Sequence, residues 1–224
     1  MEPLLDQLAR KHGSDKGPEP AGGLSGKGYT AIYSSFFESL RQRELVLLEI
    51  GVAQGASLRM WEEYFPNARI FGVDVDPDCT RYESDRTSVL IGDQADVAFL
   101  QRLVDVVAAP LDIVIDDGGH HMHQHQTSLE FLFPHVAHGG LYCIEDLHTS
   151  YRRSYGGGFR RRTATVEYLK ELADYLNRGA IRVGLRDAGP LGRLQKGSLL
   201  RRFEVFEQLD AVHLFKSLVV LHKR

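Results

Sequence analysis

Two patterns of apolar and polar residues alternate along the first two-thirds of the chain. Continuous apolar runs such as LVLLEIGV (45–52) are typical of parallel strands that are buried on both faces. Between them lie stretches such as DVAFLQRLVDVV (96–107), whose apolar residues recur at helical spacing. The expected strands are 45–52, 68–76, 87–94, 111–117 and 140–147, and the expected helices between them are 57–65, 96–107 and 125–136. This alternation predicts βαβ units and a doubly wound, Rossmann-like α/β sandwich.

The two ends of the chain extend this pattern. Helices are expected at 2–12 and 29–43, joined by a loop rich in Gly, Pro and Ser, so that residues 1–43 form a helical and loop cap. After residue 150 a helix is expected at 163–179, and residues 210–224 predict a hairpin that turns at Lys216 and Ser217. The prediction is a single domain over 1–224, with a mostly parallel seven-stranded sheet that ends in an antiparallel hairpin.

Composition narrows the setting of the protein. The chain has 224 residues, a formal net charge of −3 and 43% apolar residues, which is ordinary for a globular domain and does not favour nucleic acid as a partner. No apolar run approaches the ~20 residues of a membrane-spanning helix, so no membrane partner is expected. The N-terminus lacks the order of a signal peptide, and two cysteines are too few for a disulfide framework. We therefore expect a cytoplasmic protein, and the frequent Arg, Ala, Gly and Val suit a bacterial genome rich in G and C.

Acidic residues end three successive strands, beginning at EIGVAQGAS (49–57). Glu49, Asp74 and the GDQ at 92–94 would lie at one edge of a parallel sheet, where such folds bind ligands. Gly51 and Gly55 would allow a ligand to approach the backbone before the next helix. The alternative is a tight strand–helix turn without a ligand. Because Glu49 would repel a pyrophosphate, and because Ala53 replaces the middle glycine of a dinucleotide fingerprint, S-adenosylmethionine (SAM) is favoured over NAD.

The stretch IVIDDGGHHMHQHQ (113–126) holds the second group of candidates. Asp117 ends the fourth strand, and Glu145 and Asp146 end the fifth, so the three carboxylates should converge. A hard cation such as Mg²⁺ would relieve their repulsion, whereas the alternative is three acids spread into solvent. His120 is expected at the start of the next helix, facing the same cavity as a general base. The alternative for His120 is a histidine bonded to backbone at a helix start.

The remaining histidines are more ambiguous. His121 and His125 are four residues apart and could chelate zinc on one helix face, but no cysteine is spaced to complete a tetrahedral site. A packed or solvated helix face is the simpler interpretation for them and for His123. His148 follows the acidic pair, where a position in the pocket and a position in the loop are equally compatible with the sequence.

With these residues in view, the chain resembles the class I SAM-dependent O-methyltransferases that include the mycinamicin and tetracenomycin rhamnose 2-hydroxyl methyltransferases. The segments that carry the resemblance are KHGSDKG (11–17), GYTAIY (28–33), LLEIGVAQGASLRMWEEYFPNARIFGVDVDP (47–77), GDQADVAFL (92–100) and VIDDGGHHMHQHQTSLEFLFPHVAHGGLYCIEDLHTSY (114–151). The resemblance implies Mg²⁺ on Asp117, Glu145 and Asp146, with His120 as general base. It implies a SAM site on Glu49, Gly51, Ser57, Asp74 and Asp93, with Asp116 nearby. Gly55 and Gln94, in the same loops, complete the expected cofactor site.

The expected activity is therefore Mg²⁺-dependent transfer of a methyl group from SAM to a sugar hydroxyl. Gly119 replaces the serine of the family's DDGSH stretch, and the C-terminal third of the chain does not match clearly. Compact relatives act in cephamycin biosynthesis and on mannose polysaccharides of mycobacteria, so the sugar could belong to a natural product or a polysaccharide. Residues 149–162, with Tyr151, Arg152 and Tyr155, are expected to form a lid over this acceptor; the alternative is a solvated basic loop. The alternative acceptors are a non-sugar natural product or, because of the basic stretch RRSYGGGFRRR (152–162), a nucleic acid. By analogy with other enzymes of this fold, the helix at 29–43 is a candidate homodimer surface.

Overall fold

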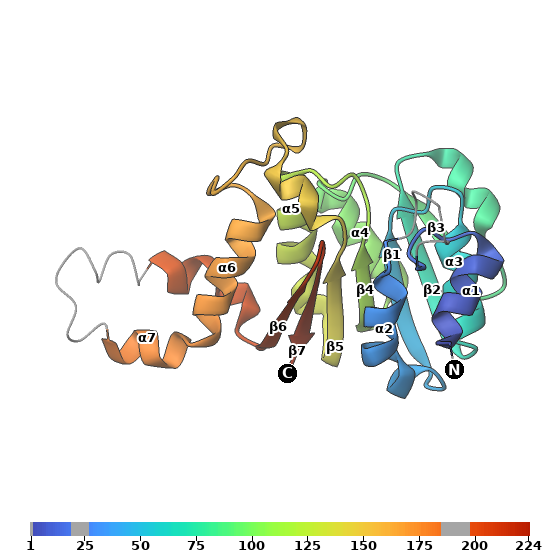
Figure 1. The fold of residues 1–224 in the computed structure, drawn as a ribbon, viewed down its shortest axis with the longest axis horizontal. Helices are drawn as coiled ribbons and strands as arrows, with labels where there is room; N and C mark the ends of the chain where they lie inside the picture. Colours follow the sequence, from blue (N-terminus) through green and yellow to red (C-terminus); the bar gives the residue numbers. More distant parts are fainter. Residues whose placement is uncertain (1, 19–26, 185–197) are drawn as a thin grey trace.

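A seven-stranded sheet forms the centre of the computed structural model, which describes residues 2–18, 27–184 and 198–224 (Figure 1). The strands are β1 (Leu45–Ile50), β2 (Ala68–Asp74), β3 (Thr87–Ile91), β4 (Leu111–Asp116), β5 (Val136–Ile144), β6 (Leu209–Phe215) and β7 (Leu218–Lys223). Their order is β3-β2-β1-β4-β5-β7-β6. The first five strands run parallel, and β7 is antiparallel to both of its neighbours. The predicted α/β sandwich, including its C-terminal hairpin, is confirmed.

Helices cover both faces of this sheet. The helices are α1 (Leu4–His12), α2 (Tyr29–Phe37), α3 (Ala56–Tyr64), α4 (Val97–Val107), α5 (Met122–Leu132), α6 (Thr165–Leu176) and α7 (Arg178–Gly184). Alternate residues of β1 enter two separate cores: Leu45 and Leu47 pack with α1, α2 and α3, whereas Val46 and Leu48 pack with α4, α5 and α6. A strand buried on both faces needs a continuous apolar run, which is the pattern that predicted it.

Several element boundaries differ from the predicted ones. Helix α5 begins at Met122 rather than at 125, because His121 and Gln124 form a capping box there. The helix ends in a 3₁₀ turn that contains Pro134, and β5 has already begun at Val136. Gly139 and Gly140 therefore lie within a strand instead of stopping the helix. Two short 3₁₀ turns, Leu147–Tyr151 and Arg153–Tyr155, form the start of the expected lid segment at 149–162. Helix α7 was not predicted.

The candidate homodimer helix α2 uses most of its apolar surface inside the chain. Tyr33 and Phe37 are fully buried and contact Trp61 of α3, with ring centroids 5.6 and 5.9 Å apart. Ile32 and Phe36 are only partly buried. A homodimer at this helix stays a prediction. None of the described helices is long and apolar enough to cross a membrane.

Candidate active site

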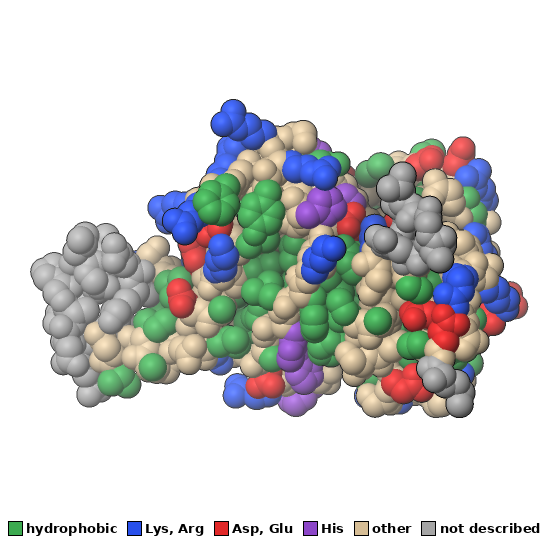
Figure 2. All heavy atoms as spheres, viewed as in Figure 1, with side chains coloured by type: hydrophobic (Ala, Val, Ile, Leu, Met, Phe, Trp, Pro, Cys, Tyr) green, Lys and Arg blue, Asp and Glu red, His purple; other side chains and the backbone are tan. Residues whose placement is uncertain are grey.

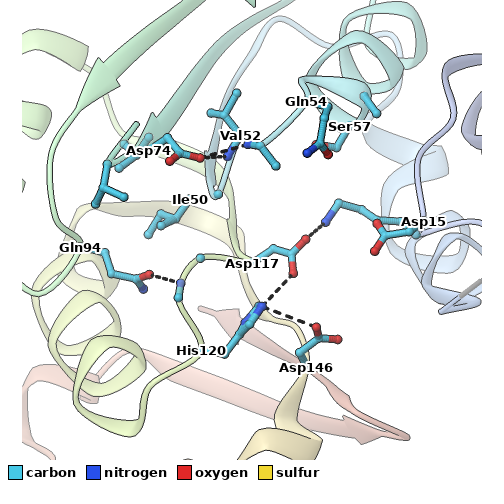
Figure 3. Close-up of a pocket in the computed structure, with 18 of the residues that line it drawn as sticks. Asp15, Ile50, Val52, Gln54, Ser57, Asp74, Gln94, Asp117, His120 and Asp146 are labelled. Carbon is cyan, nitrogen blue, oxygen red and sulfur yellow. Dashed lines mark hydrogen bonds and ion pairs between the residues drawn. The ribbon is translucent and has the colours of Figure 1, made fainter. Parts of the chain in front are cut away.

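A cavity of about 650 Å³ opens at the carboxyl ends of the parallel strands (Figure 3). Its walls come from the loops after β1, β2, β3 and β4, together with residues 13–16 and Lys27 of the N-terminal cap. In open α/β sheets this edge is where ligands bind. In Figure 3, Asp74 lies on one side of the cavity, and Asp117, His120 and Asp146 lie on another. The two predicted sites thus share one hollow.

The glycine loop after β1 packs directly on the loop after β4. Gly51 has a positive φ of 97°, and a Cβ atom added to it would lie 2.1 Å from the carbonyl oxygen of Asp117. Only glycine fits such a close approach in this conformation. Gly55, with φ 66°, is the N-cap of α3 and lies against the ring of Tyr82. The loop expected to bind the cofactor is therefore in contact with the first expected metal ligand.

Asp74 holds the glycine loop from the end of β2. Its Oδ2 atom accepts hydrogen bonds from the backbone of Val52 at 2.9 Å and of Ala53 at 3.0 Å, and Oδ1 accepts one from Asp76. Burial would raise the pKa of this carboxyl group, but the backbone hydrogen bonds outweigh it and lower the pKa below its usual value. Asp74 thus presents an ionised carboxylate at the cavity wall, where a ribose could be bound.

Asp93 and Gln94, which follow β3, both line the cavity, and Gln94 also supports its wall. Asp93 lines the cavity and accepts a hydrogen bond from the backbone of Ala95 at 2.8 Å. Gln94 is buried, donates to Asp116 Oδ1 at 2.9 Å, and accepts from the backbone of Gly119 at 3.0 Å. Asp116 is fully buried and does not line the cavity. Together with Gln94 it fixes the loop that carries Asp117 and His120.

Glu49 lies beneath the cavity rather than in its wall. Its carboxylate is fully buried, accepts a hydrogen bond from Ser57 Oγ at 2.7 Å, and lies 3.3 Å from the ammonium of Lys16. Burial raises its pKa, with Lys16 opposing the shift. Ser57 itself lines the cavity. The structure therefore connects Glu49 to the cofactor side only through its neighbours.

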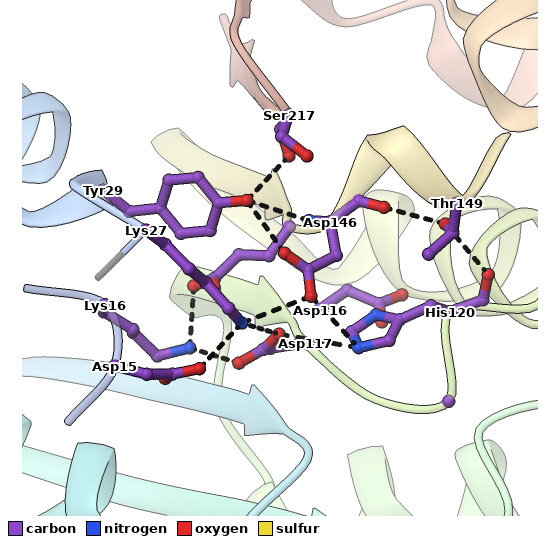
Figure 4. Close-up of polar contacts among 12 residues, drawn as sticks. Asp15, Lys16, Lys27, Tyr29, Asp116, Asp117, His120, Asp146, Thr149 and Ser217 are labelled. Atoms are coloured by element: carbon purple, nitrogen blue, oxygen red, sulfur yellow. Dashed lines mark hydrogen bonds and ion pairs between the residues drawn. The ribbon is translucent and has the colours of Figure 1, made fainter. Parts of the chain in front are cut away.

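The ends of β4 and β5 bring the three expected metal ligands together (Figure 4). Asp116 pairs with Ile144 in the sheet, so Asp117, Glu145 and Asp146 follow side by side. Two lysines meet these acids. Lys16 Nζ lies 2.5 Å from Asp117 and 2.8 Å from Glu145. Lys27 Nζ lies 3.3 Å from Asp117, 3.3 Å from Asp146 and 3.7 Å from Glu145.

Neither lysine was predicted as a site residue, although Lys16 belongs to the KHGSDKG segment of the resemblance. Both come from the N-terminal cap, where no hydrophobic period indicates how the loop folds. Their positive charges shift the pKa of the neighbouring acids. Burial raises the pKa of Asp117, but Lys16 and Lys27 lower it below its usual value. Glu145 behaves differently, since burial and then the neighbouring charge of Asp117 raise its pKa to about 8.

The acidic cluster fits a hard divalent cation. Asp117, His120 and Asp146 each offer a ligand atom, and these atoms lie within 4.8 Å of one another. Glu145 Oε2 is buried and has no hydrogen-bond partner among the described residues. Oxygen donors of this kind are what Mg²⁺ prefers. The convergence of the three carboxylates is as expected, and the closeness of the His120 ring to them also matches the prediction.

His120 lies in the loop before α5 rather than at the helix start. Its backbone is left-handed, with φ 57°. The Nε2 atom is 3.5 Å from Asp146 Oδ2 and 3.9 Å from Asp117 Oδ1, while Nδ1 is buried without a hydrogen-bond partner in the described parts of the chain. The imidazole lines the cavity and is not used as a backbone cap. The geometry therefore leaves Nε2 directed at the acids and available for proton transfer.

The other histidines take structural positions. His121 caps α5 and contacts Tyr155, with ring centroids 5.4 Å apart and the rings tilted by 50°. His125 is fully buried and contacts Thr165 Oγ1 through Nδ1 at 3.3 Å. Among the described residues, neither belongs to a cluster of three potential metal ligands, so the zinc alternative gains no support. His148 contacts Ser217 Oγ at 2.8 Å, in the turn of the hairpin.

Sequence comparison then places the chain among known proteins. No family model matches it. The 8-demethyl-8-alpha-L-rhamnosyl tetracenomycin-C 2'-O-methyltransferase of Streptomyces olivaceus is 41% identical over 183 residues, which are 78% of this chain and 46% of that protein. The mycinamicin VI 2''-O-methyltransferase of Micromonospora griseorubida is 41% identical over 136 residues, or 58% of this chain and 34% of that protein. By sequence, the chain is similar to O-methyltransferases that are named for sugar-bearing substrates. The match spans about half the length of the first of these relatives and about a third of the second.

The solved structures agree. The MycE methyltransferase of the mycinamycin biosynthetic pathway, in complex with Mg, SAH and mycinamycin VI, matches with a TM-score of 0.80 at 29% identity. The match covers 99% of this chain and 55% of that one. The class I methyltransferase fold predicted from the resemblance is confirmed. The predicted cofactors, SAM and Mg²⁺, agree with this relative, whose complexes contain Mg and SAH, the form of SAM that has lost its methyl group.

Proposed function

We propose that the chain transfers a methyl group from SAM to a hydroxyl group of a sugar, with Mg²⁺ at the acidic cluster. The observation that carries the proposal is the meeting of Asp117, His120 and Asp146 at one wall of a cavity whose other wall is the glycine loop. Glu145 is buried next to Asp146, behind this wall. Relatives at about 40% identity are named for methyl transfer to sugars, which supports this choice of acceptor.

The cofactor would lie along the loops after β1, β2 and β3. Asp74 offers an ionised carboxylate to the ribose hydroxyls, and Asp93 lies beside it at the next strand end. Gly51 and Ser57 line the floor, where the amino-acid tail of SAM would lie close to the backbone. Gln94 lines this cavity too, and with Asp116 it would hold the loop at 117–119. Glu49 would act from behind the wall by holding Ser57.

On the acceptor side, Asp117, Glu145 and Asp146 would hold Mg²⁺. When bound, the ion would lower the pKa of the sugar hydroxyl. His120 would take the proton at Nε2, the ring nitrogen that faces the acids. The oxygen would then form a bond to the methyl carbon while the carbon–sulfur bond breaks, its electron pair passing to sulfur. Holding both reactants in one cavity would supply much of the acceleration.

The segment 149–162 would close over the sugar as a lid. It contains five arginines and no acidic residue, and exposed Tyr151 and Phe159 border a hollow of about 570 Å³ that Arg153 and Arg161 also line. Figure 2 shows Lys and Arg side chains gathered over the top of the molecule, where this segment lies in Figure 1. The sugar could be carried by a natural product or by a polysaccharide such as a methylmannose polysaccharide. We place this reaction in the cytoplasm, consistent with the two free, buried cysteines.

Transfer of labelled methyl from SAM tests the proposal. The acceptors would be rhamnosides, mannosides, oligomannosides and a non-sugar phenol, each with Mg²⁺ and with EDTA. We expect transfer to a sugar that EDTA abolishes. Transfer that is indifferent to EDTA would remove the metal role of Asp117, Glu145 and Asp146. Transfer only to the phenol would replace the sugar by another natural product.

A further inference from the structure

Lys27 occupies the point at which the three carboxylates converge. Its Nζ atom lies between 3.3 and 3.7 Å from one carboxylate oxygen of each proposed metal ligand, Asp117, Glu145 and Asp146. An ammonium group is a compact cation with several donors, and these three acids are the ligands proposed for Mg²⁺. Figure 4 shows the side chain of Lys27 reaching in from the N-terminal cap toward Asp117 and Asp146.

The two lysines of the cluster differ in how they are held. Lys16 is 1% exposed, and it makes shorter contacts of 2.5 and 2.8 Å with Asp117 and Glu145 while also reaching Glu49. Lys27 is 22% exposed and makes longer contacts. Burial in an acidic pocket fixes Lys16 in the structure, whereas Lys27 lies at the edge of the cavity, where its head can move into water.

Lys27 also has a second partner. Its Nζ atom lies 3.3 Å from Oδ2 of Asp15, whose side chain is 57% exposed at the rim of the cavity. A divalent ion and the Lys27 ammonium cannot share one set of carboxylate oxygens, because two cations at that distance repel each other strongly. Asp15 offers the ammonium a carboxylate outside the cluster.

We propose that Lys27 is a placeholder cation that neutralises the acidic cluster until Mg²⁺ displaces it toward Asp15, and that it thereby sets the affinity for the metal. This inference rests on the proposed metal site. Together with Lys16, which pairs with Glu49, Asp117 and Glu145, it explains how these carboxylates and Asp146 tolerate one another before the ion is bound.

Calorimetric titration with MgCl₂, in the absence of SAM and acceptor, tests the inference in the full chain. Lys27→Met removes the competing charge, and we expect its dissociation constant for Mg²⁺ to be lower than that of the wild type by about tenfold. Without Mg²⁺ the same variant should melt at a lower temperature than the wild type, and Mg²⁺ should restore it. Lys170→Met, at an exposed lysine of α6, is the control and should change neither value.

Asp15→Asn provides an independent test, because it leaves the cluster and Lys27 intact and removes only the second partner. We expect it to weaken Mg²⁺ binding, since Lys27 is then left with the cluster alone.

The placeholder role would be overturned if Lys27→Met bound Mg²⁺ no more tightly than the wild type. If Lys27→Met does not fold, unchanged Mg²⁺ binding in Asp15→Asn would overturn it instead. The two proposals fail separately: if neither wild type nor Lys27→Met binds Mg²⁺, the metal site itself is wrong. If the wild type binds Mg²⁺, Asp117→Asn does not, and Lys27→Met matches the wild type, only the role of Lys27 is wrong.

Discussion

His120 and Asp146 face each other across the cavity wall, 3.5 Å apart between Nε2 and Oδ2, and both hold a left-handed backbone. Their φ angles are 57° and 53°, which residues other than glycine rarely adopt. Thr149 joins the two loops, because its hydroxyl group contacts the carbonyl oxygens of His120 at 3.3 Å and Asp146 at 2.8 Å. Strain of this kind persists where the surroundings hold it, and here it directs an imidazole at a carboxylate.

Replacing His120 separates its chemistry from this strain. His120→Ala and His120→Gly both remove the imidazole, so both should lower the rate of methyl transfer by about 10²–10⁴. Glycine adopts a positive φ without the steric cost of a Cβ atom, so we expect His120→Gly to be more stable than His120→Ala by about 1 kcal/mol. Methyl transfer and urea unfolding of the pair measure the two effects. Near wild-type transfer in either variant would remove His120 from its proposed role as the base.

Gly51 is the point at which the cofactor loop meets the metal loop. Gly51→Ala would place a methyl group against the backbone of Asp117 in a left-handed conformation, and we expect it to cost about 2–4 kcal/mol of folding stability. SAM binding should weaken as well, because the loop has to move. The matched control is Gly139→Ala, which has a similar φ of 75° but open space around it, and which should cost about 1 kcal/mol without affecting SAM. Equal effects of the two variants would show that the contact with Asp117 is unimportant.

Strand-end residues were the predictable part of the site. Five buried apolar runs separated by helical stretches fix where parallel strands end, and their ends meet at one edge, so Asp74, Asp117 and Glu145 could be expected there. The same alternation could have placed Glu49 more accurately. It lies on β1 two residues after Leu47, which packs toward α1, α2 and α3, so its side chain points beneath the loop rather than into the cavity.

The N-terminal cap was the part that local patterns could not supply. Lys16 and Lys27 reach Asp117, at sequence separations of 101 and 90 residues, from a segment without hydrophobic periodicity. The left-handed conformation of His120 is likewise set by tertiary contacts with Thr149 and not by its own propensity. Long-range ion pairs and strained backbone are decided by the assembled fold, which is why only the structure reveals them.

Lys16 should be indispensable to folding. Burial alone would lower its pKa, but Asp117, Glu145 and Glu49 raise it well above the usual value, so the residue is a permanent cation. Lys16→Met would leave buried carboxylates without a partner, and we expect a loss of about 3–5 kcal/mol in the free energy of unfolding. Adding Glu49→Gln should recover part of that loss, because one of the unpaired charges is removed. A double variant no more stable than Lys16→Met would show that Glu49 and Lys16 are not coupled.

The proposed lid can be tested without touching the acidic cluster. Arg153 and Arg161 line the hollow beside Tyr151 and Phe159, so Arg153→Ala and Arg161→Ala should raise KM for the sugar acceptor by about five- to tenfold. Values of kcat and of KM for SAM should change little, because neither side chain reaches the main cavity. Arg43→Ala is the control, since Arg43 is exposed and precedes the start of β1, at the end of the strands opposite to the cavity. A KM for the acceptor that stays at the wild-type value would leave the segment without a role in binding.

His125 should make the fold sensitive to acid. The ring is fully buried, its Nε2 atom has no partner among the described residues, and burial lowers its pKa below the ordinary 6.5. Below about pH 6.5 the His125 ring therefore binds a proton in the unfolded chain but not in the folded chain. The free energy of unfolding should then fall as the pH drops from 7 toward 5. His125→Asn keeps a polar group near Thr165 and removes the titration, so its stability should fall less over the same range. His138→Asn, at an exposed histidine of β5, is the control and should keep the wild-type slope. Urea unfolding at a series of pH values measures all three proteins, and parallel curves for wild type and His125→Asn would mean that the acid sensitivity lies elsewhere.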